Sequence, residues 1–313
     1  MPGLTALIPL DGTDLSESAF ALLPFIKQLG IARVSLLSIW DDDWDDERDN
    51  IPGRESDIRG VAEKGRAYLE NYLSGKADHV RSLGIEAETV VRSGHAGEEV
   101  VAYAEEAGID LIVIATHGRS GIARWRLGSV ADNIIRHASC PALVIGPNVE
   151  EELSPYAIKR IIVPLDGSAL AEQALPIAAW VARLTGATID LVRSVSVAPV
   201  SYDDSMGVYP IDLLTAMEDA AKTYLDRMAS IVGEGTRTAL LLGSAADQLL
   251  DYMKENPADL VVMAAHGRSG VKRVILGSVT DRVLHGPAPV LVLRPEEGAR
   301  TALAEAAGGA AAS

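Results

Sequence analysis

The stretches HGRSG at residues 117–121 and LGSV at 127–130 each occur a second time in this chain, at 266–270 and 276–279. In both copies, nine residues separate the first glycine from the glycine that precedes the serine. A glycine turn leading to Gly-Ser at the start of a helix suits an anion, because helix N-termini present unpaired N–H groups. The duplication therefore predicts two equivalent sites on two equivalent domains.

Each half of the sequence alternates short apolar runs with longer amphipathic stretches, which is typical of a parallel sheet flanked by helices. The fourth run of each half, LIVIA at 111–115 and LVVMA at 260–264, is continuously apolar, as expected for a strand buried on both faces. The fold class predicted is α/β and Rossmann-like, with two tandem open five-stranded parallel-sheet domains that carry helices on both faces.

The expected elements follow the same order in both halves. The strands are predicted at Leu4–Leu10, Val34–Ile39, Ala87–Val91, Leu111–Ala115 and Ala142–Ile145, then at Arg160–Leu165, Ile189–Ser194, Thr238–Leu242, Leu260–Ala264 and Val290–Leu293. The helices are predicted at Thr13–Leu29, Asp57–Ser82, Gly97–Ala107 and Ser129–His137, then at Ser168–Thr185, Ile211–Val232, Ala245–Glu255 and Ser278–His285.

A chain of 313 residues exceeds one core and fits two domains of about 150 residues. We place the first domain at 1–148, a linker at 149–158 and the second domain at 159–295, and we expect the Ala-, Gly- and Glu-rich segment 296–313 to be disordered. We find neither an apolar run of the ~20 residues that cross a bilayer nor a signal-peptide pattern. The single cysteine, Cys140, fits a reducing compartment, so we expect a cytoplasmic protein.

The formal net charge is −16. Such a surface repels nucleic-acid backbones and anionic membranes, so we expect neither as a partner. Two segments are exceptions, since Thr116–Ser129 and Ala265–Ser278 hold several basic residues and no acidic one. These basic segments coincide with the repeated loops, and this coincidence favours anion binding over chance clustering.

Glycine and serine have distinct uses in the repeated Gly-Ser pairs at 128–129 and 277–278. Glycine lets the backbone approach a phosphate oxygen, while serine can cap the helix and donate its hydroxyl. Gly118 allows a sharp turn that would bring Arg119 and Arg124 towards a polyphosphate. The alternative is an ordinary glycine turn with a serine cap. Because the spacing is duplicated, we favour the phosphate interpretation.

An aspartate follows the first strand of each half, Asp11 in the first and Asp166 in the second. A carboxylate repels phosphate, so at this sheet edge it belongs beside a sugar or a base. Its alternative role is that of a turn residue before the helix caps Thr13 and Ser168, and the residues alone leave both roles open.

Several catalytic classes lack their motifs here. The sequence has no P-loop segment, no G-x-G-x-x-G after either first strand, and no G-x-S-x-G elbow. The histidines are scattered without a cysteine partner, so we expect no protein-held metal. His117 and His266 are interpreted as residues that support the loop, since no carboxylate or nucleophile is adjacent in sequence.

Together these features resemble the universal stress protein family in its tandem, ATP-binding form. The resemblance rests on an Asp after the first strand and on a glycine pattern after the fourth, namely Gly, two residues, Gly, nine residues and Gly-Ser/Thr. It spans Leu4 to Leu293 and implies a sheet of order 3-2-1-4-5 with ATP at its carboxyl edge, any magnesium being held through the phosphates. It also implies that the two halves form an internal pseudo-dimer, and it leaves a further homodimer open.

By position, the resemblance places Asp11 and Ile39 beside ribose and adenine, and the glycines and Gly-Ser beside the phosphates. The site implied in the first half comprises Pro9, Asp11, Ile39, Ile114, His117, Gly118, Arg119, Gly121, Gly128, Ser129 and Val130. The site implied in the second half comprises Pro164, Asp166, Ser194, Met263, His266, Gly267, Arg268, Gly270, Gly277, Ser278, Val279 and Thr280.

One departure from the family pattern occurs in both copies, where Ala115 and Ala264 replace the first glycine. The added methyl group lies where the chain turns towards the ligand, so it can alter affinity. We predict an ATP-dependent stress-response switch or sensor, because a phosphate cradle is present and no catalytic base can be nominated. The alternatives are a scaffold of the same fold that binds no nucleotide, a slow ATP hydrolase, and an adenylate-transferring enzyme.

Overall fold

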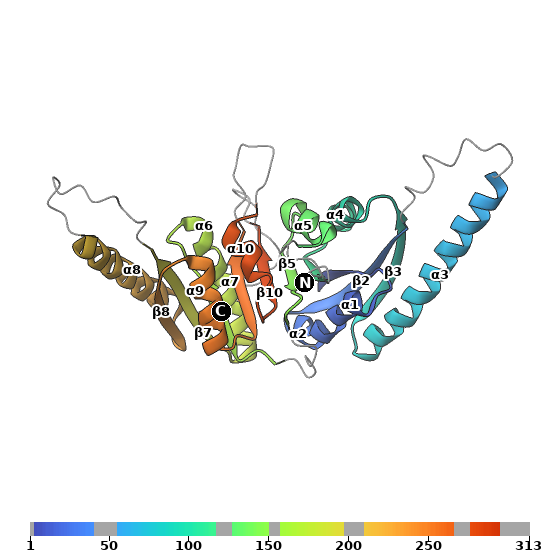
Figure 1. Ribbon diagram of the computed structural model, residues 1–313. Coiled ribbons are helices and arrows are strands. Elements are labelled where there is room, and N and C mark those ends of the chain that lie inside the picture. The colour runs from blue at the N-terminus through green and yellow to red at the C-terminus, as the bar shows by residue number, and fades with distance from the viewer. Residues whose placement is uncertain are drawn as a thin grey trace. The chain divides into compact units, whose positions relative to one another are not determined.

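A computed structural model describes residues 3–40, 55–116, 127–149, 157–196, 210–265 and 276–294, with side chains omitted for 55–63 and 210–212. The chain divides into two compact units, built mainly from Met1–Pro147 and from Ala157–Arg300 (Figure 1). Each unit contains one open sheet of five parallel strands. The predicted α/β class with a tandem arrangement is therefore confirmed.

Unit 1 has the strand order β3-β2-β1-β4-β5, which is the expected 3-2-1-4-5. Its strands are β1 (Leu4–Pro9), β2 (Ile31–Trp40), β3 (Glu86–Ser93), β4 (Leu111–Ala115) and β5 (Ala142–Ile145). Its helices are α1 (Asp14–Glu17), the 3₁₀ turn η1 (Ser18–Leu22), α2 (Leu23–Gln28), α3 (Glu55–Ser82), α4 (Ala96–Glu106) and α5 (Ser129–His137).

Unit 2 repeats this topology, with the order β8-β7-β6-β9-β10. Its strands are β6 (Arg160–Pro164), β7 (Thr188–Val195), β8 (Thr236–Leu242), β9 (Leu260–Ala264) and β10 (Val290–Leu293). Its helices are α6 (Ala169–Glu172), α7 (Ala174–Thr185), α8 (Pro210–Val232), α9 (Ala245–Glu255) and α10 (Ser278–Val283).

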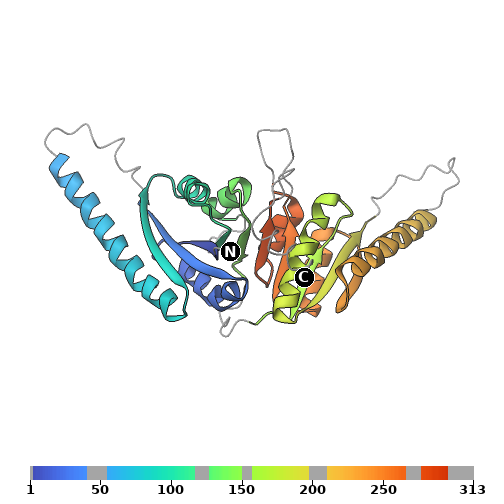
Figure 2. The same ribbon diagram turned by 180° about the vertical axis from the view of Figure 1, so that it is seen from behind.

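The strand order determines which face each helix covers. Parallel crossovers are right-handed, so helices before β2 and β3 lie on one face and helices after β3 lie on the other. Accordingly α3 packs against β2 and β3, while α4 packs against α5. Figures 1 and 2 show α3 and α4 on opposite sides of the unit 1 sheet, and α8 and α9 on opposite sides of the unit 2 sheet. Helices therefore cover both faces of each sheet.

The central strands form the core of each unit. β9 is buried at every position, and β4 is buried except at Ala115. This burial explains their unbroken apolar sequences, since neither face of the strand meets water. None of the helices in the described ranges combines the length and apolar character that a bilayer span requires.

Two predicted helices are divided in the structure, and a third ends two residues early. The helix expected at 13–29 is divided into α1, η1 and α2, and the one expected at 168–185 is divided into α6 and α7. Pro24 has no N–H to donate to the carbonyl of Phe20, which accepts from Leu23 in a 3₁₀ turn instead. Pro176 likewise cannot donate to Glu172, where α6 ends. The helix expected at 278–285 ends at Val283, shortly before Gly286-Pro287.

A second duplicated aspartate has a structural role. Asp110 precedes β4, and its Oδ2 accepts the N–H of Thr5 at 2.8 Å. Asp259 precedes β9, and its Oδ2 accepts the N–H groups of Lys159 and Arg160 at 2.8 and 2.9 Å. Both carboxylates therefore join the amino ends of neighbouring strands, at the sheet edge opposite Asp11 and Asp166.

Leu73 and Tyr68 test which face of α3 covers the sheet. Leu73 is 0% exposed and Tyr68 is 70% exposed. We expect Leu73→Ala to lower the free energy of unfolding of unit 1 by about 2–5 kcal/mol, because a cavity replaces a fully packed side chain. Tyr68→Ala on the same helix is the control, and its effect should stay within about 0.5 kcal/mol. Hydrogen exchange of the β2 and β3 amides measures the difference, and equal effects would contradict the packing.

Candidate functional site

Each sheet reverses its strand order beside its first strand, between β1 and β4 in unit 1 and between β6 and β9 in unit 2. The helices that follow these two strands lie on opposite faces of the sheet, and this arrangement opens a crevice at the carboxyl ends. Open α/β sheets bind ligands at such a crevice. A cavity is present at this position in each unit.

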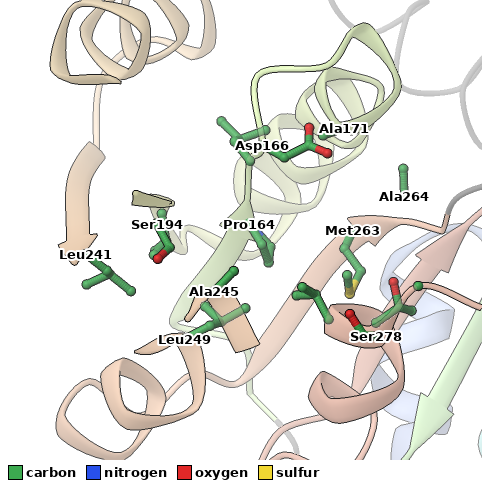
Figure 3. Close-up of a pocket in the computed structure, with 15 residues that line it drawn as sticks. Pro164, Asp166, Ala171, Ser194, Leu241, Ala245, Leu249, Met263, Ala264 and Ser278 are labelled. Atoms are coloured by element: carbon green, nitrogen blue, oxygen red, sulfur yellow. The ribbon is translucent and has the colours of Figure 1, made fainter. Parts of the chain in front are cut away.

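The unit 2 cavity has a volume of about 380 Å³. Figure 3 shows Asp166, Ser194 and Ser278 around it, from the end of β6, from β7 and from the start of α10. The predicted residues that line it are Pro164, Asp166, Ser194, Met263, Gly277, Ser278, Val279 and Thr280. The structure thus brings together residues that span more than a hundred positions in sequence.

The unit 1 cavity has a volume of about 130 Å³. The predicted residues that line it are Pro9, Asp11, Ile39, Ile114 and Val130. Gly128 and Ser129 immediately precede Val130 at the start of α5, but they are not among its lining residues. The predicted loop residues lie outside the described ranges in both units: His117, Gly118, Arg119, Gly121, His266, Gly267, Arg268 and Gly270.

The aspartate after the first strand has the same local geometry in both units. Asp11 Oδ1 accepts the N–H of Thr13 at 3.0 Å and its hydroxyl at 2.6 Å. Asp166 Oδ1 accepts the N–H of Ser168 at 2.8 Å and its hydroxyl at 2.6 Å. Both capping side chains in turn accept a helix N–H. The turn role is therefore observed in both units, and the same carboxylate also lines the cavity of its unit.

Asp11 remains an anion in this environment. Burial raises the pKa of its carboxyl, but hydrogen bonds, chiefly from the side chain and backbone of Thr13, outweigh burial, so the pKa is lowered overall. An ionised carboxylate only accepts hydrogen bonds. It therefore suits a hydroxyl or amino group of a ligand and disfavours a phosphate.

At Gly128, neither backbone strain nor packing among the described residues requires a glycine. Gly128 has φ −58° and ψ 147°, which any residue adopts, and a Cβ at this position would have no atom of the described residues within 4 Å. Gly277 has φ −61° and ψ 143°. The first N–H groups of the helices that follow have no intrahelical partner. Glycine is also a favourable N-cap residue, and its lack of a side chain leaves the backbone at 128 open to the close approach of a ligand.

In unit 1, a tyrosine on the helix after the second strand contacts α1, the helix that follows the aspartate turn. Tyr72 on α3 donates its hydroxyl to Glu17 at 3.0 Å, and Lys76 pairs with Glu17 at 2.5 Å. The Lys76 hydrogen bond is the main cause that lowers the pKa of Glu17. In unit 2, burial and then Glu172 raise the pKa of Tyr224 to about 12, so its phenol stays protonated at neutral pH.

Sequence reasoning missed several apolar walls of the unit 2 cavity. Val192 lies two residues before Ser194 on the same face of β7, so the period of a strand could have found it. Leu165 adjoins the predicted Asp166. The other unpredicted lining residues are Ala171, Leu241, Ala245 and Leu249. In unit 1 they are Leu10, Ser16, Leu37, Ala96 and Val100. Ala115 and Ala264, the departures from the glycine pattern, line the two cavities.

The arrangement offers binding groups rather than a metal centre. Within the described ranges, no group of three or more His, Cys, Asp or Glu side chains is placed to hold a metal ion. The Ser194 hydroxyl donates to the carbonyl of Gly243 at 2.8 Å, so its oxygen is left to accept from a ligand. An apolar cavity with a few convergent polar groups is the usual form of a small-molecule site.

Comparisons with known proteins agree with this architecture. Universal stress protein MJ0531 of Methanocaldococcus jannaschii is 30% identical over 139 residues, which cover 44% of this chain and 82% of the relative. Universal stress protein Rv1996 of Mycobacterium tuberculosis is 26% identical over 243 residues, which cover 75% of this chain and 71% of the relative. The crystal structure of a universal stress protein from Archaeoglobus fulgidus superimposes with a TM-score of 0.68 at 21% identity, over 94% of this chain and 99% of that chain.

The crystal structure comparison shows the fold alone, because its sequence identity is low. The family assignment rests on the sequence model of the universal stress protein family, which matches twice, at residues 5–146 and 157–294. These two matches correspond to the two described units and cover most of the chain. The chain therefore belongs to the universal stress protein family, in a tandem form.

Proposed function

We propose that this chain binds an adenine nucleotide, ATP, and acts as a nucleotide-dependent switch or sensor in a stress response. The observation that carries the proposal is the unit 2 cavity, where an acidic turn, a strand serine and a Gly-Ser helix start face one space of about 380 Å³. This volume lies within the roughly 300–1,000 Å³ of ligand pockets. Family membership supports the same proposal.

The lining groups fit the three parts of a nucleotide. Val192, Leu241 and Leu249 provide an apolar wall that suits a purine. The Asp166 carboxylate suits the ribose hydroxyls, since it accepts hydrogen bonds and repels phosphate. The backbone N–H groups after Gly277 suit the phosphates, whose magnesium would be held through phosphate oxygens.

Backbone amides are an appropriate partner for phosphates on this molecule. The chain carries a formal charge of −16, so a triphosphate meets overall repulsion. Local N–H dipoles provide attraction without changing the net charge. His266, Gly267, Arg268 and Gly270 complete the proposed phosphate loop of unit 2, and their first-half equivalents are His117, Gly118, Arg119 and Gly121.

A scaffold that binds no nucleotide is the second candidate, and Ala264 favours it. Its methyl group lies on the cavity wall, where the family pattern has glycine. The retained Gly277-Ser278 pair argues for binding instead. Calorimetry with millimolar ATP and magnesium distinguishes the two, because the scaffold would produce no heat of binding.

The proposal includes two further features from the sequence. We place the protein in the cytoplasm, in keeping with the single free cysteine, Cys140, which is buried. We also propose that the two units form an internal pseudo-dimer, as their repeated topology would allow. A homodimer of whole chains is a separate question that sedimentation at several concentrations answers.

Two substitutions of Gly277 distinguish an effect on phosphate binding from an effect on helix stability. Asp and Asn are both favourable N-cap residues, so Gly277→Asp and Gly277→Asn should leave the melting temperature unchanged or higher. Only the aspartate adds a negative charge beside the phosphates. We expect the dissociation constant for ATP to rise at least roughly tenfold more in Gly277→Asp than in Gly277→Asn. Equal constants by calorimetry would contradict phosphate binding at this helix start.

Asp166 tests the placement of the sugar. Asp166→Asn keeps an oxygen that can accept from Ser168, so the turn should persist. Loss of a hydrogen bond to a charged group costs roughly 1.5–3 kcal/mol, so ATP affinity should fall by about tenfold or more. With 2′,3′-dideoxy-ATP, which lacks the hydroxyls, the wild-type and variant proteins should bind alike. A loss of the same size with both ligands would place the carboxylate elsewhere.

Turnover distinguishes a switch from an enzyme. No described residue is placed as an evident base or nucleophile for ATP hydrolysis, so we expect bound ATP to persist through purification. Phosphate release should remain far below the rate of roughly 1 per second at the low end of ordinary enzymes. Single-turnover measurement with labelled ATP provides the rate, and a value at or above that limit would refute the switch.

A further inference from the structure

The two cavities differ in size although the two units share one topology. The unit 2 cavity of about 380 Å³ is large enough for a drug-sized ligand, and the unit 1 cavity of about 130 Å³ lies below the usual range. Several described residues that line the two cavities also differ at equivalent positions.

The strand register identifies the first exchange. Pro9 pairs with Leu37 and Pro164 pairs with Val192, so Ile39 and Ser194 are equivalent, each two residues further along its strand. Both line their cavities. A branched aliphatic side chain therefore fills part of the space in unit 1 that a small hydroxymethyl group leaves open in unit 2.

The neighbouring strand carries the second exchange. Ile39 pairs with Arg92 on β3, and Ser194 pairs with Leu241 on β8. Arg92 forms ion pairs with Glu99 at 3.3 Å and with Glu106, both on α4. Leu241 instead lines the unit 2 cavity. This corner is thus an ionic cluster in unit 1 and an apolar wall in unit 2.

Polar groups at the helix start differ as well. Ser278 and Thr280 of α10 both line the unit 2 cavity, whereas Val130 is the residue of α5 that lines the unit 1 cavity. Ser16 lines the unit 1 cavity, but its hydroxyl donates to the carbonyl of Thr13 at 2.9 Å and accepts the N–H of Asp11 at 3.3 Å. Its hydrogen bonds are therefore directed into the turn.

We infer that the two sites are functionally unequal: unit 2 holds the nucleotide, and unit 1 does not bind it at concentrations that saturate unit 2. The inference rests on the proposed function and adds its stoichiometry, one adenine nucleotide per chain. The residues that determine it are Ser194 and Leu241 in unit 2, in place of Ile39 and Arg92 in unit 1. Unit 1 then has the same fold as unit 2, but its structure does not depend on bound nucleotide.

A matched pair of alanines tests this inference. Ala245 and Ala96 are the first residues of α9 and α4, and each lines the cavity of its own unit. Neither is buried, and leucine is nearly as good a helix former as alanine, so both Ala→Leu variants should fold. The full chain is titrated with Mg-ATP by calorimetry, and nucleotide is counted per chain after acid extraction.

The wild-type chain should bind one equivalent of ATP. Ala245→Leu should raise the dissociation constant by roughly tenfold or more, because the new side chain occupies the cavity. Ala96→Leu should leave both affinity and stoichiometry unchanged. Ser194→Ile, which copies the unit 1 residue into unit 2, should weaken binding as Ala245→Leu does.

The outcomes separate this inference from the proposed function. If the wild-type chain binds two equivalents with equal affinity, or Ala96→Leu removes bound nucleotide, the inference is overturned while nucleotide binding stands. Unchanged binding in both Ala245→Leu and Ser194→Ile also overturns it. If the wild-type chain binds no adenine nucleotide at all, the proposed function itself fails.

Discussion

The right-handedness of parallel crossovers is the constraint on which this structure depends. Given the order 3-2-1-4-5, it forces the chain to leave β1 and β4 towards opposite faces, and likewise β6 and β9. The backbone cannot fill the space between these diverging ends, so a crevice remains at the carboxyl edge of each sheet. Both cavities lie in this crevice, and the acidic turns and helix starts border it for the same topological reason. The opposite edge needs no such space, and there Asp110 and Asp259 join neighbouring strands.

Electrostatics then divides the crevice into regions of different character. Asp166 accepts two hydrogen bonds from Ser168, which fixes a negative charge at the end of β6. On the other side, the start of α10 presents N–H groups and the positive end of the helix dipole. A ligand with a neutral polar part and an anionic part has one favoured orientation between these two regions. The fold therefore favours one orientation of such a ligand, independently of any contact that is specific to a base.

Much of this architecture could be predicted from sequence, where local signals coincide with burial. LIVIA and LVVMA gave the bounds of β4 and β9 as observed, because a strand buried on both faces has an unbroken apolar sequence with polar flanks. Pro24 and Pro176 were visible signals of the helix breaks that the predicted 13–29 and 168–185 helices ignored. The walls formed by Leu241 and Leu249 were harder to predict. Their position depends on the register of β7 with β8 and on how α9 packs, which are properties of the sheet rather than of any local pattern.

Divergence after the duplication took two forms. In one contact, the changes compensate for one another: in unit 1 the acid is Glu88 on β3, which accepts from Tyr103 at 3.0 Å, and in unit 2 it is Asp190 on β7, which accepts from Tyr252 at 3.1 Å. The acid lies on different strands in the two units, while the contact with the tyrosine is kept. At the cavities, no second substitution restores the volume that is lost between Ile39 and Ser194. Ser194 leaves space that Ile39 fills in unit 1, and Leu241 does not fill that space in unit 2. Stability alone would favour filling that space, since an open apolar surface forgoes packing contacts. The larger cavity of unit 2 therefore agrees with the ligand proposed for it.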